Sequence, residues 1–421
     1  MPENLDANRR VVVTGLGLIC AVGVGLKQCW SRLLAGEGGV RRITRFDPEG
    51  FESQIAAEVQ GFDPLDYMER KEARRMDRFA QFAVAAAREA LQSATLAISP
   101  RDSERVGVII GSAMGGMGAL EDAYATLHSR GPSRVSPFFV PMMLADLAAG
   151  QVSILLGARG PNWAPVSACA TGAHAIGEAA AIIRRGDADV ILAGGAEAPI
   201  TPASVAGYAS MGALSRHNAH PERASRPFDA ERDGFVIGEG AGVLVLESEE
   251  HARARDATIL ALVAGYGATA DAYHIVEPSP GGGGAARAMR LALSSAGLQP
   301  PDLGYLNAHG TSTPTNDRLE TAAIKAALCE HAAALPISSI KGAIGHTLGA
   351  GGAVEAAISV MVLQTGKAPP TINYRTPDPD CDLDYVPNLS RDLGTIGAVM
   401  TNSMGFGGHN ASVVFTHPEA R

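Results

Sequence analysis

The chain has 421 residues, of which 46% are hydrophobic and 19% charged; this is typical of a folded protein and excludes a largely disordered one. Its net charge of −9 argues against a surface that binds nucleic acid. No apolar run reaches the roughly 18 residues of a membrane span, and the polar start of the chain does not look like a signal peptide. We therefore expect a cytoplasmic protein with no membrane span and no nucleic-acid partner.

Short β-rich runs alternate with Ala-rich stretches in the first half of the chain. The expected elements are a strand at 11–14, a helix at 72–92, a strand at 106–110, a helix at 142–156, a strand running into residue 167, a loop at 168–172 that opens a helix to about residue 185, and strands at 190–193 and 242–247. This alternation predicts a layered α/β fold with mainly parallel strands.

The second half repeats that order. Its expected elements are a strand at 259–264, a helix at 285–296, a strand at 305–308, a helix at 317–329, a strand at 337–340, a helix at 350–363, and strands at 396–401 and 411–415. A duplicated fold, with halves at 1–255 and 256–421, explains the length without a linker. Two independent domains on a flexible linker are the alternative, but the composition near residue 255 is not linker-like.

One of the five cysteines stands out by its position. The set is odd in number and has no CxxC pair, which argues against a disulfide framework. Cys169 sits between two alanines at a predicted strand-to-helix turn, where the helix N-terminus stabilises a thiolate and small neighbours leave room for a substrate. We predict that Cys169 is a nucleophile; a buried, inert thiol is the alternative.

Two histidines follow predicted strands of the second half. Ligands gather at the carboxyl ends of parallel strands, so a pseudo-two-fold axis is expected to bring His309 and His346 to the Cys169 loop. Hydrogen-bonded structural histidines are one alternative. A zinc site formed with Cys169 is another, but no acidic residue stands in a zincin-like spacing, and we expect no metal or redox cofactor.

Charged and glycine-rich positions surround these motifs. Lys341 precedes His346 in the same loop, and Asp317 and Glu320 open the helix after His309; a buried ammonium paired with a carboxylate could orient the imidazoles, although solvated surface charges are the alternative. The segment 403–410 lies between two strands, and its glycines permit a turn whose N–H groups could bind an oxyanion. An ordinary glycine-rich hairpin is the bland reading of that segment.

These residues resemble the motifs of the elongating β-ketoacyl-ACP synthases of the thiolase superfamily, closest to the synthase II type. The similar blocks are VSACATGAH at 166–174, NAHGTSTP at 307–314, KGAIGHTLG at 341–349, and further blocks at 226–235 and 238–240. The similarity covers nearly the whole chain. It implies a thiolase-like duplicated fold layered α-β-α-β-α, with two mixed sheets.

The resemblance also implies roles. Cys169 would accept the acyl chain, and His309 and His346 would bind the malonyl thioester and assist decarboxylation. Lys341 and Glu320 would support the site, with Asp317 nearby, and Thr311 and Thr313 would contact the pantetheine arm. Phe406 would be the gate, and its amide would join that of Cys169 in the oxyanion hole. The implied reaction is the decarboxylative Claisen condensation of acyl-ACP with malonyl-ACP. It lengthens a fatty-acid or polyketide chain by two carbons.

The implied partners are acyl carrier protein and a second copy of the chain. The carrier protein is acidic, so the cluster of Arg70, Arg74, Arg75 and Arg78 is a candidate contact, with a solvated helix face as the alternative. Four positions depart from the common family pattern and bear on chain-length preference and the gate: Val276, Gly351, Met404 and His409.

Two other functions compete with this one. A chain-length-determining or scaffold subunit would bind acyl chains without needing a nucleophile. A degradative thiolase generally uses a second cysteine as base, but this chain has Phe406 and Gly407 in the matching loop.

Overall fold

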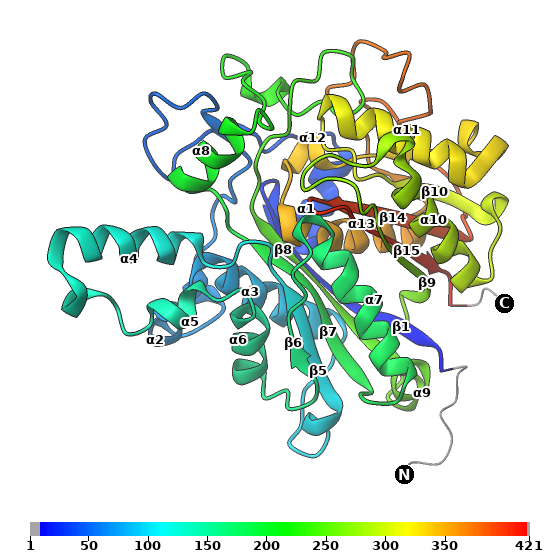
Figure 1. The fold of residues 1–421 in the computed structure, drawn as a ribbon. Helices are drawn as coiled ribbons and strands as arrows, with labels where there is room; N and C mark the ends of the chain where they lie inside the picture. Colours follow the sequence, from blue (N-terminus) through cyan, green and yellow to red (C-terminus); the bar gives the residue numbers. More distant parts are fainter. Residues whose placement is uncertain (1–8, 419–421) are drawn as a thin grey trace.

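Strands from both halves of the chain form one sheet in the computed structural model, which describes residues 9–418 (Figure 1). Within these residues the sheet has 11 strands, ordered β11-β10-β14-β15-β9-β1-β8-β7-β5-β6, with β2 paired to β1. The strands are β1 (Val11–Cys20), β2 (Gly23–Val24), β5 (Val106–Gly111), β6 (Asn162–Trp163), β7 (Val190–Glu197), β8 (Gly240–Ser248), β9 (Ala261–Ala270), β10 (Leu303–Asn307), β11 (Ile337–Ser338), β14 (Ala398–Gly405) and β15 (His409–Thr416).

The two halves of the sheet have corresponding strand orders, β6-β5-β7-β8-β1 in the first half and β11-β10-β14-β15-β9 in the second, as a duplicated fold requires. In each half, three strands run parallel (β6-β5-β7 and β11-β10-β14), and the next two are antiparallel (β8-β1 and β15-β9). The two mixed sheets that we expected are joined into one by two residue pairs, Val12–Leu262 and Val13–Ala261. Edge strands carry unpaired N–H and C=O groups, and this pairing satisfies part of them. The domain boundary at residue 255 stays a prediction.

Helices make the remaining three layers. The central pair, α7 (Thr171–Arg184) and α13 (Gly351–Thr365), packs against strands of both halves, and this places it between them (Figure 1). On the outer faces, α3 (Arg78–Ser93) and α6 (Leu147–Leu156) cover the first half, and α10 (Gly283–Ala296) and α11 (Pro314–Leu328) cover the second. The expected α-β-α-β-α layering is therefore confirmed.

The central position of α13 explains its composition. Contrary to the expectation from the sequence, the segment Leu348–Thr365 is long and apolar enough to span a membrane, but 83% of it is buried inside the protein. A helix that is apolar all round is a core helix when other elements cover every face.

Two predicted helices are each interrupted. The helix expected at 72–92 is α2 (Arg70–Ala73) followed by α3, since Asp77 adopts an extended conformation before α3 and its carboxylate accepts the Ala119 N–H at 2.7 Å. The one at 142–156 divides into α5 (Phe139–Met143) and α6.

Several elements were not predicted. The remaining helices are α1 (Leu26–Leu34), α4 (Met117–Arg130), α8 (Pro202–Ser210), α9 (Glu249–Ala254) and α12 (Lys341–Ile344), and the remaining strands pair as β3 (Arg41–Arg42) with β4 (Ile55–Ala56) and β12 (Lys367–Ala368) with β13 (Arg391–Asp392). The longest of them, α4, buries only Ala119 and Ala123, so its sequence lacks a clear apolar stripe.

Glycines let the two central helices touch. A Cβ at Gly352 would lie 2.6 Å from the Ala173 nitrogen, and one at Gly172 would lie 2.5 Å from the Ala353 nitrogen. This close approach draws together the start of α7, which follows Cys169, and the start of α13, which follows the His346 loop.

We predict that Gly352→Ala destabilises the protein by about 1–3 kcal/mol, because the added methyl group overpacks a contact that cannot widen without moving both helices. Urea unfolding measures this. Gly207→Ala in α8 is the control: it has free space around the new Cβ, so the better helix former is expected to leave stability unchanged or raise it by up to about 1 kcal/mol. Equal stability of Gly352→Ala and the wild type would contradict the packing argument.

Candidate active site

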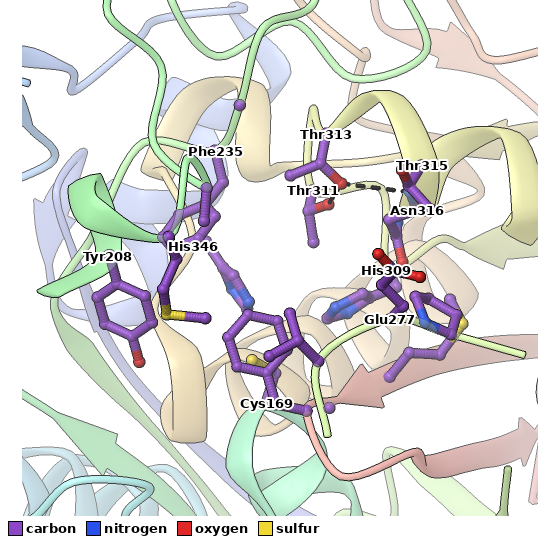
Figure 2. A pocket seen from close by; sticks show the side chains of 18 of the residues that line it. Cys169, Tyr208, Phe235, Glu277, His309, Thr311, Thr313, Thr315, Asn316 and His346 are labelled. Carbon is purple, nitrogen blue, oxygen red and sulfur yellow. Dashed lines mark hydrogen bonds between the residues drawn. The ribbon is translucent and has the colours of Figure 1, made fainter. Parts of the chain in front are cut away.

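A cavity of about 350 Å³ opens where the predicted motifs meet. Cys169, His309 and His346 line it together with the gate candidate Phe406 (Figure 2). The nucleophile candidate comes from the first half of the chain and the two histidines from the second, and both imidazoles project toward the middle of the cavity above Cys169. His309 and His346 therefore lie beside the Cys169 loop, as the pseudo-two-fold axis predicts.

Cys169 lies in the 3₁₀ turn Ala168–Ala170 that leads directly into α7. The turn between β14 and β15 presses against it: a Cβ at Gly405 would lie 2.7 Å from the Ser167 oxygen and 3.0 Å from the Cys169 nitrogen. This contact brings the Phe406 amide toward the sulfur, where it lowers the pKa of the thiol.

The Cys169 thiol is buried at the wall of the cavity. Burial raises its pKa to about 12; the Lys341 charge and the Phe406 amide pull the pKa down, while Glu197 and Glu355 push it up. The helix N-terminus favours the thiolate and burial opposes it, because enclosing the sulfur removes the water that would solvate an anion.

The two imidazoles are neutral. The rings of His309 and His346 cross edge to face with their centroids 5.2 Å apart, and both side chains are buried. Burial lowers both pKa values well below 6.5, and the Lys341 charge lowers them further. A neutral imidazole keeps one N–H donor and one acceptor nitrogen, and can therefore donate a hydrogen bond without carrying charge.

Lys341 begins α12 and is itself fully buried. Its ammonium forms an ion pair with Glu355 of α13, and its Nζ lies 3.5 Å from Nδ1 of His309. Because an ammonium only donates, Nδ1 is the acceptor and the His309 proton sits on Nε2. Glu355 was not among the residues predicted for the site, although it is the single charged residue of α13 and a lone carboxylate in an apolar helix is a usable signal.

The other two carboxylates support the backbone. Glu320 accepts the N–H groups of His309 and Gly310, both at 2.7 Å, and burial raises its pKa to about 7. Asp317 accepts the Phe228 N–H at 2.8 Å. The ammonium–carboxylate pair that we expected is therefore made by Lys341 with Glu355.

A further buried carboxylate went unnoticed in the sequence. Glu197, at the end of β7, accepts the Ser112 hydroxyl at 2.7 Å and the amides of Ala113 at 2.7 Å and Gly349 at 3.0 Å. It ties the loop after β5 to the loop that follows His346. The residues around Glu197 in the sequence do not indicate this role, because its hydrogen-bond partners are far along the chain.

Two threonines form the opposite wall of the cavity (Figure 2). The hydroxyls of Thr311 and Thr313 lie 2.9 Å apart, and Thr313 also caps α11 by accepting the Asn316 N–H at 3.3 Å. Of the positions that depart from the family pattern, Val276 and Met404 line the same cavity.

Within residues 9–418, no group of three or more His, Cys, Asp or Glu side chains is arranged to hold a metal ion.

The four arginines of the candidate carrier contact differ in their exposure to solvent. Arg70, Arg74 and Arg75 are exposed, whereas Arg78 is partly buried and forms an ion pair with the buried Glu239 at 2.8 Å, so its charge is already paired and it is the weakest of the four candidate contacts.

Comparisons with known proteins agree on one family. The β-ketoacyl synthase N-terminal domain matches residues 8–252 and the C-terminal domain matches residues 260–375. The chain is 52% identical to 3-oxoacyl-[acyl-carrier-protein] synthase 2 of Staphylococcus aureus (strain COL) over 416 residues, which is 99% of this chain and 100% of that one. It is 50% identical to the Synechocystis protein of the same name, over 98% of this chain and 99% of that one.

Solved structures are similar as well. A β-ketoacyl synthase from Burkholderia phymatum superposes with a TM-score of 0.91 at 37% identity, covering 98% of this chain and 100% of that one. A type II PKS acyl-carrier protein in complex with its ketosynthase, bound to the hexaketide, gives a TM-score of 0.89 at 37% identity, again over 98% and 100%. The chain belongs to the β-ketoacyl synthase family. It is an acyl-transferring condensing enzyme.

We predict that Lys341→Met slows alkylation of Cys169 by iodoacetamide. Removing the ammonium raises the thiol pKa, and the thiolate fraction at a given pH then falls about tenfold for each unit of that rise. In the wild type the alkylation rate is expected to climb through the alkaline range without levelling near pH 7. The exposed Lys367, replaced in the same way, is the control. Equal rates for Lys341→Met and the wild type would show that the ammonium does not act on the sulfur.

Proposed function

We propose that the protein is a β-ketoacyl-ACP synthase of the synthase II type, which condenses acyl-ACP with malonyl-ACP through an acyl-Cys169 intermediate. The observation that supports this most directly is the meeting of one thiol and two neutral imidazoles on the wall of one cavity. The names of the relatives from Staphylococcus aureus and Synechocystis point to the same substrates.

The first step is acyl transfer to the enzyme. The Cys169 sulfur bonds to the acyl carbonyl carbon, the bond from that carbon to the carrier sulfur breaks, and the thiol proton ends on the departing carrier thiol. The amides of Cys169 and Phe406 hold the oxyanion that forms in between. Burial disfavours a free thiolate, so the sulfur loses its proton as the new bond forms.

The second step is condensation. Malonyl-ACP loses CO₂, and the electron pair of the broken bond forms an enolate whose oxygen accepts hydrogen bonds from His309 and His346. The enolate carbon then attacks the acyl group on Cys169, forming a carbon–carbon bond and returning the sulfur as a thiol once it takes up a proton. Neutral donors suit this step, because a charged imidazolium would pass its proton to the enolate and end the reaction.

Lys341 and Glu355 keep the donor in place. The ammonium holds Nδ1 of His309 as acceptor, so that Nε2–H is free to face the substrate. Thr311 and Thr313, on the opposite wall, are positioned for the amide and hydroxyl groups of the pantetheine arm.

We also propose that the enzyme works as a cytoplasmic homodimer. The sheet ends at β6, a two-residue edge strand, and exposed apolar side chains gather beside it and on the neighbouring helices: Tyr124, Leu127, Val140, Ile154, Trp163 and Val166. An edge strand flanked by apolar surface is a common site of association. A concentration-independent monomer in sedimentation would contradict the dimer.

The alternative functions fit less well. A scaffold subunit does not need a thiol flanked by two neutral imidazoles, and a degradative thiolase lacks its second cysteine here, because Phe406 occupies that loop. Condensation by the isolated protein, assayed with acyl-ACPs of graded length, separates these alternatives and reports whether short or long chains are extended.

We expect Cys169→Ala to abolish the acyl-enzyme that mass spectrometry detects after incubation with acyl-ACP. His309→Ala and His346→Ala are expected to retain acylation and to lose condensation by at least about 100-fold, since each removes a donor to the developing oxyanion. Cys329→Ala, at an exposed thiol, is the control. Acylation of Cys169→Ala at another residue would refute the assignment of the nucleophile.

Charge reversal in the arginine cluster tests the carrier surface. Arg74→Glu is expected to raise the apparent KM for acyl-ACP several-fold and to leave kcat unchanged, because it repels an acidic partner without reaching the cavity. Arg101→Glu is the control: Arg101 is exposed and precedes β5, at the strand ends opposite the site. An unchanged KM for Arg74→Glu would exclude this surface.

A further inference from the structure

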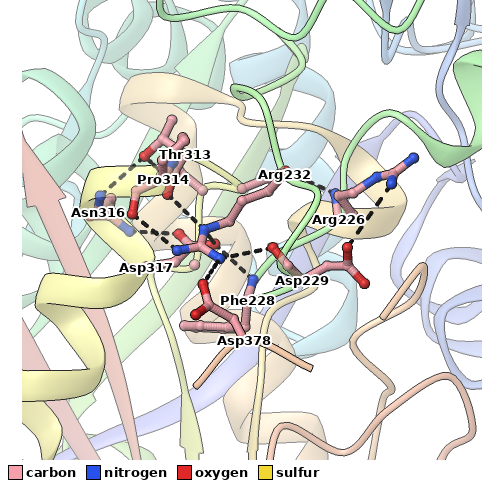
Figure 3. Close-up of polar contacts among 12 residues, drawn as sticks. Arg226, Phe228, Asp229, Arg232, Thr313, Pro314, Asn316, Asp317 and Asp378 are labelled. Carbon is pink, nitrogen blue, oxygen red and sulfur yellow. Dashed lines mark hydrogen bonds and ion pairs between the residues drawn. The ribbon is translucent and has the colours of Figure 1, made fainter. Parts of the chain in front are cut away.

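The loop that carries the two cavity threonines is held by a distant segment, 226–235 (Figure 3). Ser312 adopts a positive φ of 70°, which a residue with a side chain rarely does. Two N–H groups of that segment fix it: Arg226 donates to the Ser312 hydroxyl at 2.9 Å, and Gly234 donates to the Ser312 carbonyl at 3.2 Å. The loop conformation is therefore imposed from outside.

Arg232 completes this support. Its Nε donates to the Thr313 carbonyl at 3.2 Å and its terminal nitrogens donate to the Pro314 carbonyl at 3.0 Å and the Asp229 carbonyl at 2.8 Å. Only 4% of the side chain is exposed, and it does not line the cavity. The guanidinium thus holds the backbone carbonyls of Thr313, whose hydroxyl lines the cavity, and of Pro314 (Figure 3).

The position of the Arg232 guanidinium is electrostatically unfavourable unless nearby negative charges offset it. A cation beside the N-terminus of α11 opposes the helix dipole. Two carboxylates offset it: Asp378 pairs with Arg232 at 2.5 Å, and Asp317, in the first turn of α11, lies 3.6 Å from its Nε. A planar guanidinium can satisfy three carbonyls and two carboxylates at once, whereas a lysine ammonium at the same place has fewer and differently directed donors.

We propose that Arg232 is a positioning residue for the pantetheine arm: it fixes the 311–314 loop so that the hydroxyls of Thr311 and Thr313 face the substrate. This inference rests on the proposed function, because it needs a pantetheine thioester in the cavity. It also gives Asp317 a role, which is to hold the guanidinium and the Phe228 amide at the root of α11.

The experiment uses Arg232→Lys in the full-length protein. Loss of two backbone hydrogen bonds is expected to raise the apparent KM for acylation about five- to tenfold, equally with acyl-ACP and with acyl-pantetheine, and to leave kcat within about twofold. Alkylation of Cys169 by iodoacetamide, which has no pantetheine arm, is expected to be unchanged. A purely structural role would instead lower the thermal midpoint and slow all three reactions together.

Arg226→Lys is the matched control. Arg226 lies on the same segment and is equally buried, but its side chain pairs with Glu231 and the Arg223 carbonyl and does not reach the loop. If Arg232→Lys does not fold, Asp378→Asn loosens the same guanidinium from a partly exposed position and is expected to raise KM about twofold.

An unchanged KM in Arg232→Lys, or a change confined to acyl-ACP, overturns the inference, as does an unchanged KM in Asp378→Asn where that variant replaces it. Failure of the wild type to become acylated by either thioester would refute the proposed function itself.

Discussion

The buried ammonium of Lys341 is the feature on which the rest of the site depends. It lies between the carboxylate of Glu355 and Nδ1 of His309. A buried charge is tolerated only when it is paired, and this one is paired across the central layer of the molecule. Burial holds both imidazoles uncharged and the field of Lys341 adds to that effect, while at Cys169 the same field lowers the thiol pKa against the effect of burial. One cation therefore acts on the pKa values of three groups.

The fold delivers these groups by duplication. The parallel strands of each half end at the same side, so the loops after them meet across the pseudo-two-fold axis. The nucleophile comes from the start of α7, and the partner of the ammonium from α13; these two helices touch because Gly172 and Gly352 leave no side chain between them. The close packing of α7 and α13 therefore also determines the geometry of the active site.

Support for the cavity wall comes from a third direction. The segment 226–235 lies between the two halves' motifs in sequence, and it donates hydrogen bonds to the backbone carbonyls of Ser312, Thr313 and Pro314. Its arginines carry little information about catalysis when read alone, because their side chains face away from the cavity. Their partners are carbonyl groups and carboxylates distant in sequence, and only the folded chain brings them together.

The sequence by itself determined the alternation of strands and helices, the repeated order and the identities of Cys169, His309 and His346, because periodicity and local motifs encode them. Tertiary structure alone decided the joining of the two sheets through β1 and β9, the pairing of Lys341 with Glu355 and the pairing of Arg78 with the buried Glu239. It also decided the enclosure of Cys169: a helix N-terminus, visible in the sequence, favours a thiolate, whereas burial by the rest of the protein raises the pKa of the thiol. Burial and long-range pairing depend on contacts between distant residues, and a local pattern does not record them.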